Sequence, residues 1–388
     1  MKVTPTDPET ERELVALAHS FAEREIRPVA AALDEAEVFP WEVFHAACAV
    51  GLASVDIPAE YGGIGIDSLV TSCLITEELT WGDSGVSAVI SGNGFFAGPI
   101  LALGTEEQKR RWVAPLTRPD SPAAALALTE PGAGSDAAAI VTHARRVDGG
   151  YLLNGSKTWI SNAPDADRYL VYATVEPGSR SRGITTFVVE KGDEGFALGT
   201  KIPKLGTRCC PSGELFFDDC FVAEDRRIGD EGQGFRGVLE WFDRSRVLLA
   251  AGSCGVGRAA LEHAVAYAKE REAFGQKIHG FQAVSFRLVD AKLKLDQARL
   301  LTHHAARLAD AGEPYTTESA MAKVAASEAA FFAAWAAMQT FGGNGYSREF
   351  PVEKLLRDAK LDEIWEGTSD IQRLIVARAM FRDEEERR

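Results

Sequence analysis

The sequence predicts a multidomain α+β protein in which two helical domains flank a middle domain of β-strands. The chain has 388 residues, more than one ordinary hydrophobic core accommodates. Apolar residues repeat with a helical period at both ends of the chain and alternate as in strands between them. We therefore expect an N-terminal helical domain over residues 1–120, a β-barrel-like domain over 121–232 and a four-helix bundle over 233–388.

The N-terminal domain is expected to contain several helices joined by turns. IPAEYGG at 57–63 is a turn-rich break, and Thr105 precedes a helix whose first turn carries two carboxylates. Helices are expected before Pro28, over 41–50, over 68–80 and after Thr105.

Turn signals divide the middle of the chain into short β-rich runs. Asp148-Gly149-Gly150 and Asn154-Gly155 are two such signals. Strands are expected over residues 123–128, 140–147, 151–154, 169–175, 184–190 and 215–217.

The C-terminal part is expected to form a bundle of four long antiparallel helices. They cover residues 235–272, 282–311 and 316–341, with a last helix after Thr368. The charged RDEEERR at 382–388 is expected to be a solvated tail.

Charge and cysteine usage favour a cytoplasmic protein without a nucleic-acid or membrane partner. The net charge of −15 disfavours binding to phosphate backbones and anionic membranes. The six cysteines show no CxxC pattern, which indicates a reducing compartment. The N-terminal MKVTPTDPETEREL is too acidic for a signal or transit peptide, and the apolar run 329–341 is too short to span a bilayer.

Several common site patterns are absent from the sequence. There is no strand–GxGxxG–helix unit, no P-loop lysine and no order of residues that suggests a hydrolase triad. His303 and His304 are neighbours on an expected helix and point in different directions, so we expect no metal site.

The stretch LDEIWEGTSDIQRLIVAR at 361–378 places a carboxylate immediately before a helix. Glu366 lies between Trp365 and Gly367, and Thr368 then begins the helix. A helix N-terminus offers unpaired N–H groups and partial positive charge. The residues alone allow either a functional carboxylate or an ordinary solvated Glu.

Four further motifs combine glycines, hydroxyls, an indole or an Arg in expected loops. TEPGAGSD at 129–136 allows close backbone approach to a ligand, or is an ordinary turn. Trp159 in KTWISN at 157–162 is a ligand contact or a core residue. FGGNGY at 341–346 is a binding loop or a helix C-cap, and Arg271 in REAFG holds a diphosphate or forms a surface ion pair.

Together these motifs resemble the acyl-CoA dehydrogenase family, and its short- and medium-chain members most. The resemblance is carried by TEPGAGSD, WIS, REAFG, FGGNGY, PVEKLLRDAK at 351–360 and WEGTSDIQRLIVAR at 365–378, and it extends to IPAEYGGIG at 57–65. It implies an FAD enzyme that passes electrons to an electron-transfer flavoprotein, with FAD between the β domain and the bundle. Family members are usually homotetramers with FAD at a dimer interface, so a homotetramer or homodimer is expected.

The resemblance also assigns roles to individual residues. Ser135, Asp243, Arg246 and Gly367 would touch the acyl thioester. Gln339, Gly342 and Gly343 would reach the FAD of a partner subunit. The residues implied to bind FAD are Leu126, Leu128, Thr129, Gly134, Ser135, Trp159, Ile160, Ser161, Arg271, Phe274, Gln282, Gln339, Gly342, Gly343, Thr368 and Asp370.

Glu366 falls on the catalytic base of the family. A base must take the weakly acidic proton α to the thioester while hydride leaves the β-carbon for flavin N5. In the family, the N–H of the base residue and a ribityl hydroxyl donate to the thioester oxygen. Some members place the base on the first bundle helix, but Ser245 stands there in this chain and cannot act as one.

Departures from the family pattern suggest the size of the acyl group. Trp365 stands where the family usually has Tyr, and Ala273 stands where it often has Thr. Phe95 takes the place of a Leu, and Ser87 and Ser91 take the places of larger polar residues. The aromatic changes would shorten the acyl cavity and the serines would widen it, so we expect a short or branched acyl group. An acyl group on a carrier protein is the alternative substrate. The alternative from another functional class is a member of the family that binds nucleic acid without catalysis. The net charge of −15 and the presence of Glu366 both disfavour this alternative.

Overall fold

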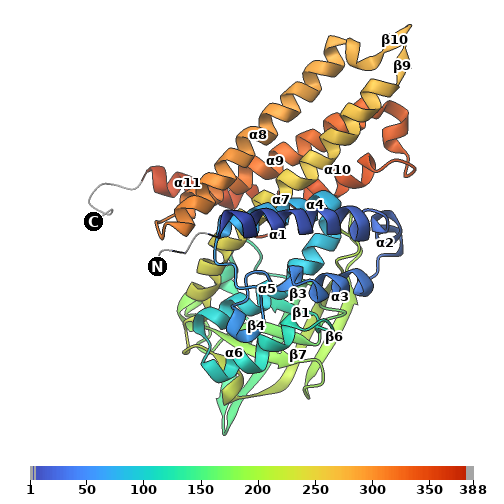
Figure 1. Ribbon diagram of the computed structural model, residues 1–388. Helices are drawn as coiled ribbons and strands as arrows, with labels where there is room; N and C mark the ends of the chain where they lie inside the picture. The colour runs from blue at the N-terminus through green and yellow to red at the C-terminus, as the bar shows by residue number, and fades with distance from the viewer. Residues whose placement is uncertain (1–2, 4–5, 382–388) are drawn as a thin grey trace.

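The computed structural model describes residue 3 and residues 6–381. The long C-terminal helices extend to one end of the molecule, the β-sheet lies at the other, and N-terminal helices lie between them (Figure 1). The predicted order of a helical, a sheet and a second helical domain is confirmed. The RDEEERR tail at 382–388 lies outside the described residues.

The helices predicted before Pro28, over 41–50, over 68–80 and after Thr105 are found, whereas the helices Ala30–Ala36 and Ser84–Leu103 are additions to the prediction. A short π-helical segment at Ala22–Ile26 carries the first helix on toward Pro28. Thr105 and Gln108 form a capping box, which fixes the start of the last helix of this domain. The helices are α1 (Pro8–Phe21), α2 (Ala30–Ala36), α3 (Trp41–Ala49), α4 (Leu69–Gly82), α5 (Ser84–Leu103) and α6 (Glu106–Trp112).

Helix α5 is the longest of the described helices that the sequence does not predict. It contains Pro99 and glycines such as Gly92 and Gly98, which are poor helix formers. A Cβ on Gly98 would lie 2.2 Å from the ring of Trp241 on α7, so close packing on the bundle requires this glycine. Among the described residues α5 is also the one helix long and apolar enough to span a membrane, but 61% of that window is buried within the protein.

The middle domain is a single mixed sheet of eight strands. Seven strands pair in the order β6-β7-β3-β2-β4-β5-β8, and β1 pairs with β4 in parallel. Since β6 and β8 lie at the two ends, the described strands form an open sheet rather than a closed barrel. The strands are β1 (Ala124–Ala127), β2 (His143–Val147), β3 (Gly150–Ser161), β4 (Arg168–Thr174), β5 (Ile184–Glu190), β6 (Phe196–Lys201), β7 (Ser212–Ala223) and β8 (Arg227–Ile228).

One of the two predicted turns of this domain is instead part of a strand. Gly149 has φ +75° and closes the β2–β3 hairpin as expected. At Asn154-Gly155, however, β3 continues to Ser161 with a shift in its pairing to β7. Gly155 has φ +143°, and a Cβ there would lie 2.5 Å from Thr142 Oγ1, so the glycine serves a close approach between strands.

The C-terminal domain contains three long helices and two short ones, where four long helices are expected. Helix α10 is absent from the sequence prediction because it is brief and follows the glycine-rich segment. The helices are α7 (Gly234–Glu270), α8 (Gln282–Asp310), α9 (Thr316–Phe341), α10 (Val352–Leu361) and α11 (Ser369–Met380). The two-residue strands β9 (Glu272–Ala273) and β10 (Gln276–Lys277) form a hairpin between α7 and α8.

Candidate active site

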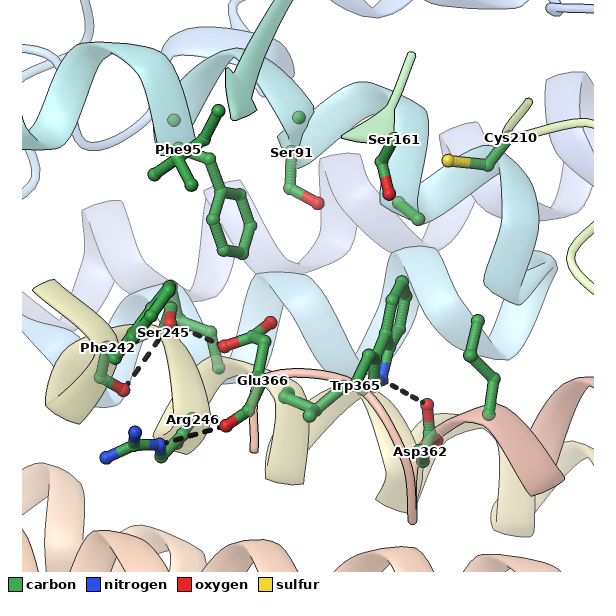
Figure 2. A pocket seen from close by; sticks show the side chains of 18 of the residues that line it. Ser91, Phe95, Ser161, Cys210, Phe242, Ser245, Arg246, Asp362, Trp365 and Glu366 are labelled. Carbon is green, nitrogen blue, oxygen red and sulfur yellow. Dashed lines mark hydrogen bonds between the residues drawn. The ribbon is translucent and has the colours of Figure 1, made fainter. Parts of the chain in front are cut away.

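A cavity of about 1080 Å³ lies where the three domains meet. Helices α4 and α5, the ends of β1 and β3, helix α7 and the loop before α11 all contribute to its wall. Figure 2 shows Glu366 and Trp365 on one side, with Phe95, Ser91 and Ser161 opposite them. Predicted site residues in the wall are Leu126, Leu128, Thr129, Gly134, Ser135, Trp159, Ile160, Ser161, Arg246, Glu366, Gly367 and Thr368.

The loop that carries Glu366 is held in one conformation by side chains of other helices that donate to its backbone carbonyls. Glu366 has φ +54° and Gly367 has φ +88°, both in the left-handed region. Arg246 Nε donates to the carbonyl oxygen of Glu366 at 3.1 Å, and Lys323 Nζ donates to that of Gly367 at 3.0 Å. Thr368 then caps α11, since its Oγ1 accepts from the Ile371 N–H at 3.2 Å. The backbone that carries the Glu366 carboxylate is therefore fixed by contacts within the chain.

The side chain of Glu366 points along the cavity wall toward α7 (Figure 2). Its Oε2 accepts a hydrogen bond from Ser245 Oγ at 2.5 Å. Burial raises the pKa of the Glu366 carboxyl, whereas the Ser245 bond and the charges of Arg246 and Lys323 lower it. Glu366 is only partly exposed and lines the cavity, which disfavours the ordinary solvated alternative.

The loop after β1 and the end of β3 form another part of the cavity wall. Trp159 has φ +60° at a break in the pairing of β3 with β7, and its indole is 58% exposed. The core interpretation of Trp159 is therefore wrong. Beneath the loop, the buried Lys157 Nζ donates to Leu128 O at 3.0 Å and to Glu130 Oε1 at 2.7 Å.

Six predicted cofactor residues gather at the far end of the bundle instead. The β9–β10 hairpin projects from the end of the bundle that lies away from the sheet (Figure 1). Phe274, at its tip, is 96% exposed, and Arg271 makes no ion pair within the part of the chain that is described. Gly342 is the C-cap of α9, so the C-cap interpretation of FGGNGY is confirmed. The set comprises Arg271, Phe274, Gln282, Gln339, Gly342 and Gly343.

Two further predicted residues lie near the cavity without lining it. Asp243 Oδ1 accepts from Arg246 Nη1 at 3.0 Å, and its Oδ2 accepts from Thr316 Oγ1 at 2.5 Å. Asp370 is exposed in the first turn of α11, with Oδ1 at 3.5 Å from Arg373 Nη1. Asp243 thus orients the Arg246 side chain that holds the Glu366 loop.

Comparisons with known proteins find relatives that match nearly the whole chain. Models of the acyl-CoA dehydrogenase N-terminal, middle and C-terminal domains match residues 8–120, 125–220 and 232–381. The chain belongs to the acyl-CoA dehydrogenase family. It is therefore an FAD-dependent oxidoreductase of the acyl-CoA dehydrogenase type.

Individual relatives give the same result. The mitochondrial short-chain specific acyl-CoA dehydrogenase of Rattus norvegicus is 40% identical over 376 residues, 97% of this chain and 91% of that protein. Butyryl-CoA dehydrogenase from Megasphaera elsdenii has a TM-score of 0.93 at 36% identity, with 98% of this chain and 100% of that one covered. The prolyl acyl carrier protein oxidase AnaB has a TM-score of 0.92 at 30% identity, with 97% of this chain and 100% of that one covered.

The cavity of this acyl-CoA dehydrogenase fits a flavin. The exposed Trp159 offers an aromatic face, and the Ser161 hydroxyl lies in the same wall. An added Cβ at Gly132 or Gly134 would meet nothing within 4 Å, so the loop leaves open space beside its backbone. We would place the ring system against Trp159 and Ser161, as the resemblance implies.

Asp362 lines the cavity four residues before Glu366, although no sequence pattern marks it as a site residue. Asp362 is 2% exposed, and its carboxylate accepts from Ser253 Oγ at 2.8 Å. It also accepts from Trp365 Nε1 at 3.1 Å (Figure 2). The bond to Trp365 fixes the indole as part of the cavity wall. Burial raises the pKa of Asp362 from 3.8 to about 7, although Ser253 and the charge of Lys323 oppose this.

The stability of Asp362→Asn is expected to fall less with rising pH than the stability of the wild-type protein. Between about pH 4 and 7 the folded protein holds a proton on Asp362 that the unfolded chain lacks, so wild-type stability falls as pH rises through this range. A pKa that moves from 3.8 to about 7 corresponds to roughly 4 kcal/mol. Thermal unfolding midpoints at pH 5 and pH 8 measure the difference. Parallel pH curves for the two proteins would contradict the assignment, and Asp296→Asn on the exposed face of α8 is the control.

Proposed function

We propose that this enzyme converts an acyl-CoA thioester to the trans-2-enoyl thioester, with Glu366 as the base that removes the α-proton. The observation that carries the proposal is the Glu366 carboxylate in the wall of the cavity where the three domains meet, on a loop fixed from three sides. Burial raises the pKa of this group toward the working pH, which improves a general base. FAD, when bound, supplies the hydride acceptor.

The backbone of Glu366 supports a second role. Arg246 Nε and Gln372 Nε2 donate to its carbonyl oxygen at 3.1 and 3.3 Å, which fixes the orientation of the peptide. Its own N–H makes no hydrogen bond to any described residue. A preorganised, unpaired donor beside the base is suited to the thioester oxygen, where negative charge develops as the α-proton leaves.

The visible spectrum tests the proposed reaction directly. Purified holoenzyme is mixed without oxygen with a panel of acyl-CoA thioesters, and bleaching of the flavin absorbance is recorded. Bleaching by one chain length, with enoyl-CoA as the product, supports the proposal and names the substrate class. A flavoprotein that no acyl thioester reduces, whether carried by CoA or by carrier protein, would overturn it.

The acyl group is proposed to be short or branched. Phe95 packs edge-on against Trp241 with ring centroids 6.0 Å apart, and Asp362 holds the Trp365 indole in the wall. Two aromatic side chains thus occupy volume in the cavity, whereas Ser87 and Ser91 leave lateral room. Faster turnover of octanoyl than of butyryl or isobutyryl thioester would contradict this proposal.

Phe95→Ala is expected to move the preference toward longer chains. Removing the ring opens space in the wall opposite Glu366, and each methylene accommodated in an apolar pocket changes kcat/KM by roughly tenfold or more. The measurement is the ratio of kcat/KM for octanoyl-CoA to that for butyryl-CoA. Phe221→Ala, on the exposed face of β7, should leave the ratio unchanged. An unaltered ratio in Phe95→Ala would mean that Phe95 does not limit the chain length.

An acyl group on a carrier protein is the second candidate substrate. The 30% identity to the carrier-protein oxidase AnaB, over 97% of this chain, favours keeping it. Both candidates require the same proton abstraction, and they differ in what delivers the thioester to the cavity. Rates of flavin reduction with CoA-bound and carrier-bound forms of one acyl group separate them.

We propose that copies of the chain assemble into a homodimer or homotetramer. An apolar stripe of Phe286, Val289, Leu293 and Leu300 is exposed along one face of α8, which is typical of an unpaired interface. A partner subunit would also bring the residues at the far end of its bundle, among them the exposed Phe274, toward the cavity of the first subunit. Light scattering on the purified holoenzyme tests the assembly. A cytoplasmic location and electron transfer to an electron-transfer flavoprotein complete the proposal.

A further inference from the structure

A serine on helix α7 is in direct contact with the proposed base, and the reaction as described gives it no role. Ser245 Oγ donates to Glu366 Oε2 at 2.5 Å, and Ser245 is 2% exposed. Both residues line the cavity, although they are 121 residues apart in the sequence. The sequence alone indicates only that Ser245 cannot be the base.

The hydroxyl has a second acceptor within reach. The carbonyl oxygen of Phe242, one turn earlier on α7, lies 3.4 Å from Ser245 Oγ. A serine hydroxyl carries one proton, so it can donate fully to only one of the two oxygens at a time. Figure 2 shows both contacts, with the Glu366 carboxylate and the Phe242 carbonyl on different sides of the hydroxyl.

We propose that Ser245 is a positioning residue that orients the ionised Glu366 carboxylate and keeps it ionised until substrate binds. Once Glu366 has taken the α-proton, the hydroxyl turns to the Phe242 carbonyl and the protonated carboxyl is released. The inference rests on the proposed function, in which Glu366 is the base.

The surroundings of Glu366 explain why one neutral donor matters. Arg246 on α7 uses Nε on the Glu366 carbonyl and Nη1 on Asp243, and Lys323 on α9 uses Nζ on the Gly367 carbonyl. Both cations thus favour the ionised form by their charge without bonding the carboxylate. Asp362 at the end of α10 is a further titratable group in the wall. Ser245 makes the one side-chain hydrogen bond to the carboxylate among the described residues.

The test compares Ser245→Ala with Ser245→Thr in the holoenzyme. Loss of the donor should raise the apparent pKa of the base by about one pH unit, since a hydrogen bond to the charged form favours ionisation. Anaerobic flavin reduction by saturating substrate should therefore slow about tenfold near pH 6 and much less near pH 9. Thr keeps the hydroxyl and should restore the wild-type profile.

A second measurement does not depend on turnover. The infrared band of a protonated carboxyl, assigned by its absence in Glu366→Gln, should persist to higher pH in Ser245→Ala than in wild type. Ser327→Ala is the matched control, because Ser327 is a buried serine on helix α9 that donates to the Val324 carbonyl and does not line the cavity. The profile of this control is expected to follow wild type. FAD content and unfolding midpoints establish that each variant is folded.

The outcomes separate the inference from the function on which it rests. If Ser245→Ala has a wild-type pH profile while Glu366→Gln is inactive, the inference is wrong and the proposed function stands. If Glu366→Gln reduces its flavin at the wild-type rate, Glu366 is not the base and both are wrong. A shift in Ser245→Ala that Ser245→Thr does not restore would also overturn the inference, because the hydroxyl would not be its cause.

Discussion

Glu366→Gln is expected to lose substrate-dependent flavin reduction while its FAD content stays normal. The amide keeps the size of the side chain and can still accept from Ser245, so the loop and cavity should not change. It cannot take a proton from the α-carbon, and loss of a general base lowers a rate by roughly 10³-fold or more. Anaerobic stopped-flow bleaching of the flavin measures the rate, and the absorbance spectrum gives the FAD content.

Glu363→Gln provides a matched control three residues away. The Glu363 carboxylate pairs with Lys360 Nζ at 2.5 Å and does not line the cavity. This variant carries the same chemical change in the same loop, so near wild-type reduction is expected. Full activity of Glu366→Gln would show that another residue removes the proton. Equal loss in both variants would point to damage of the loop rather than loss of a base.

Lys157→Met is expected to destabilise the protein by about 3–5 kcal/mol and to lower its FAD content. Lys157 and Glu130 form a buried ion pair, with Lys157 fully inaccessible. Removing one partner leaves a buried carboxylate without its cation, which is the costly way to break such a pair. The same lysine ties Leu128 to the TEPGAGSD loop, so the wall of the cavity should loosen. Urea denaturation and flavin absorbance are the measurements.

The double variant Lys157→Met with Glu130→Gln distinguishes charge from packing. Glutamine can still accept from the N–H groups of Val141 and Thr142, which donate to Glu130 at 2.7 and 3.0 Å. With both charges gone, stability is expected to recover by more than half. Lys292→Met on the exposed face of α8 controls for loss of a lysine. Wild-type stability of Lys157→Met alone would contradict the assigned role of the pair.

Local residue patterns predict the long helices well, because their signals lie within each segment. The limits of α9 agree with the expected Thr316–Phe341, and α7 and α8 begin or end within two residues of expectation. In contrast, α5 contains several glycines and Pro99, so its helical state depends on packing against its neighbours. The bulge at Gly155 likewise depends on Thr142, which immediately precedes strand β2 and lies outside any local window around Gly155.

The candidate site divides in the same way. The sequence by itself was sufficient to identify the family motifs, the flavin-binding class and Glu366 as the candidate base. A motif consists of residue types at fixed spacing, so it can be recognised without the structure. Only the tertiary structure decided that Ser245 bonds Glu366 across 121 positions and that Asp362 holds Trp365 in the cavity wall. Such contacts depend on how α7 packs against the loop before α11. The spacing of residues within one segment does not predict the distance between side chains of two segments.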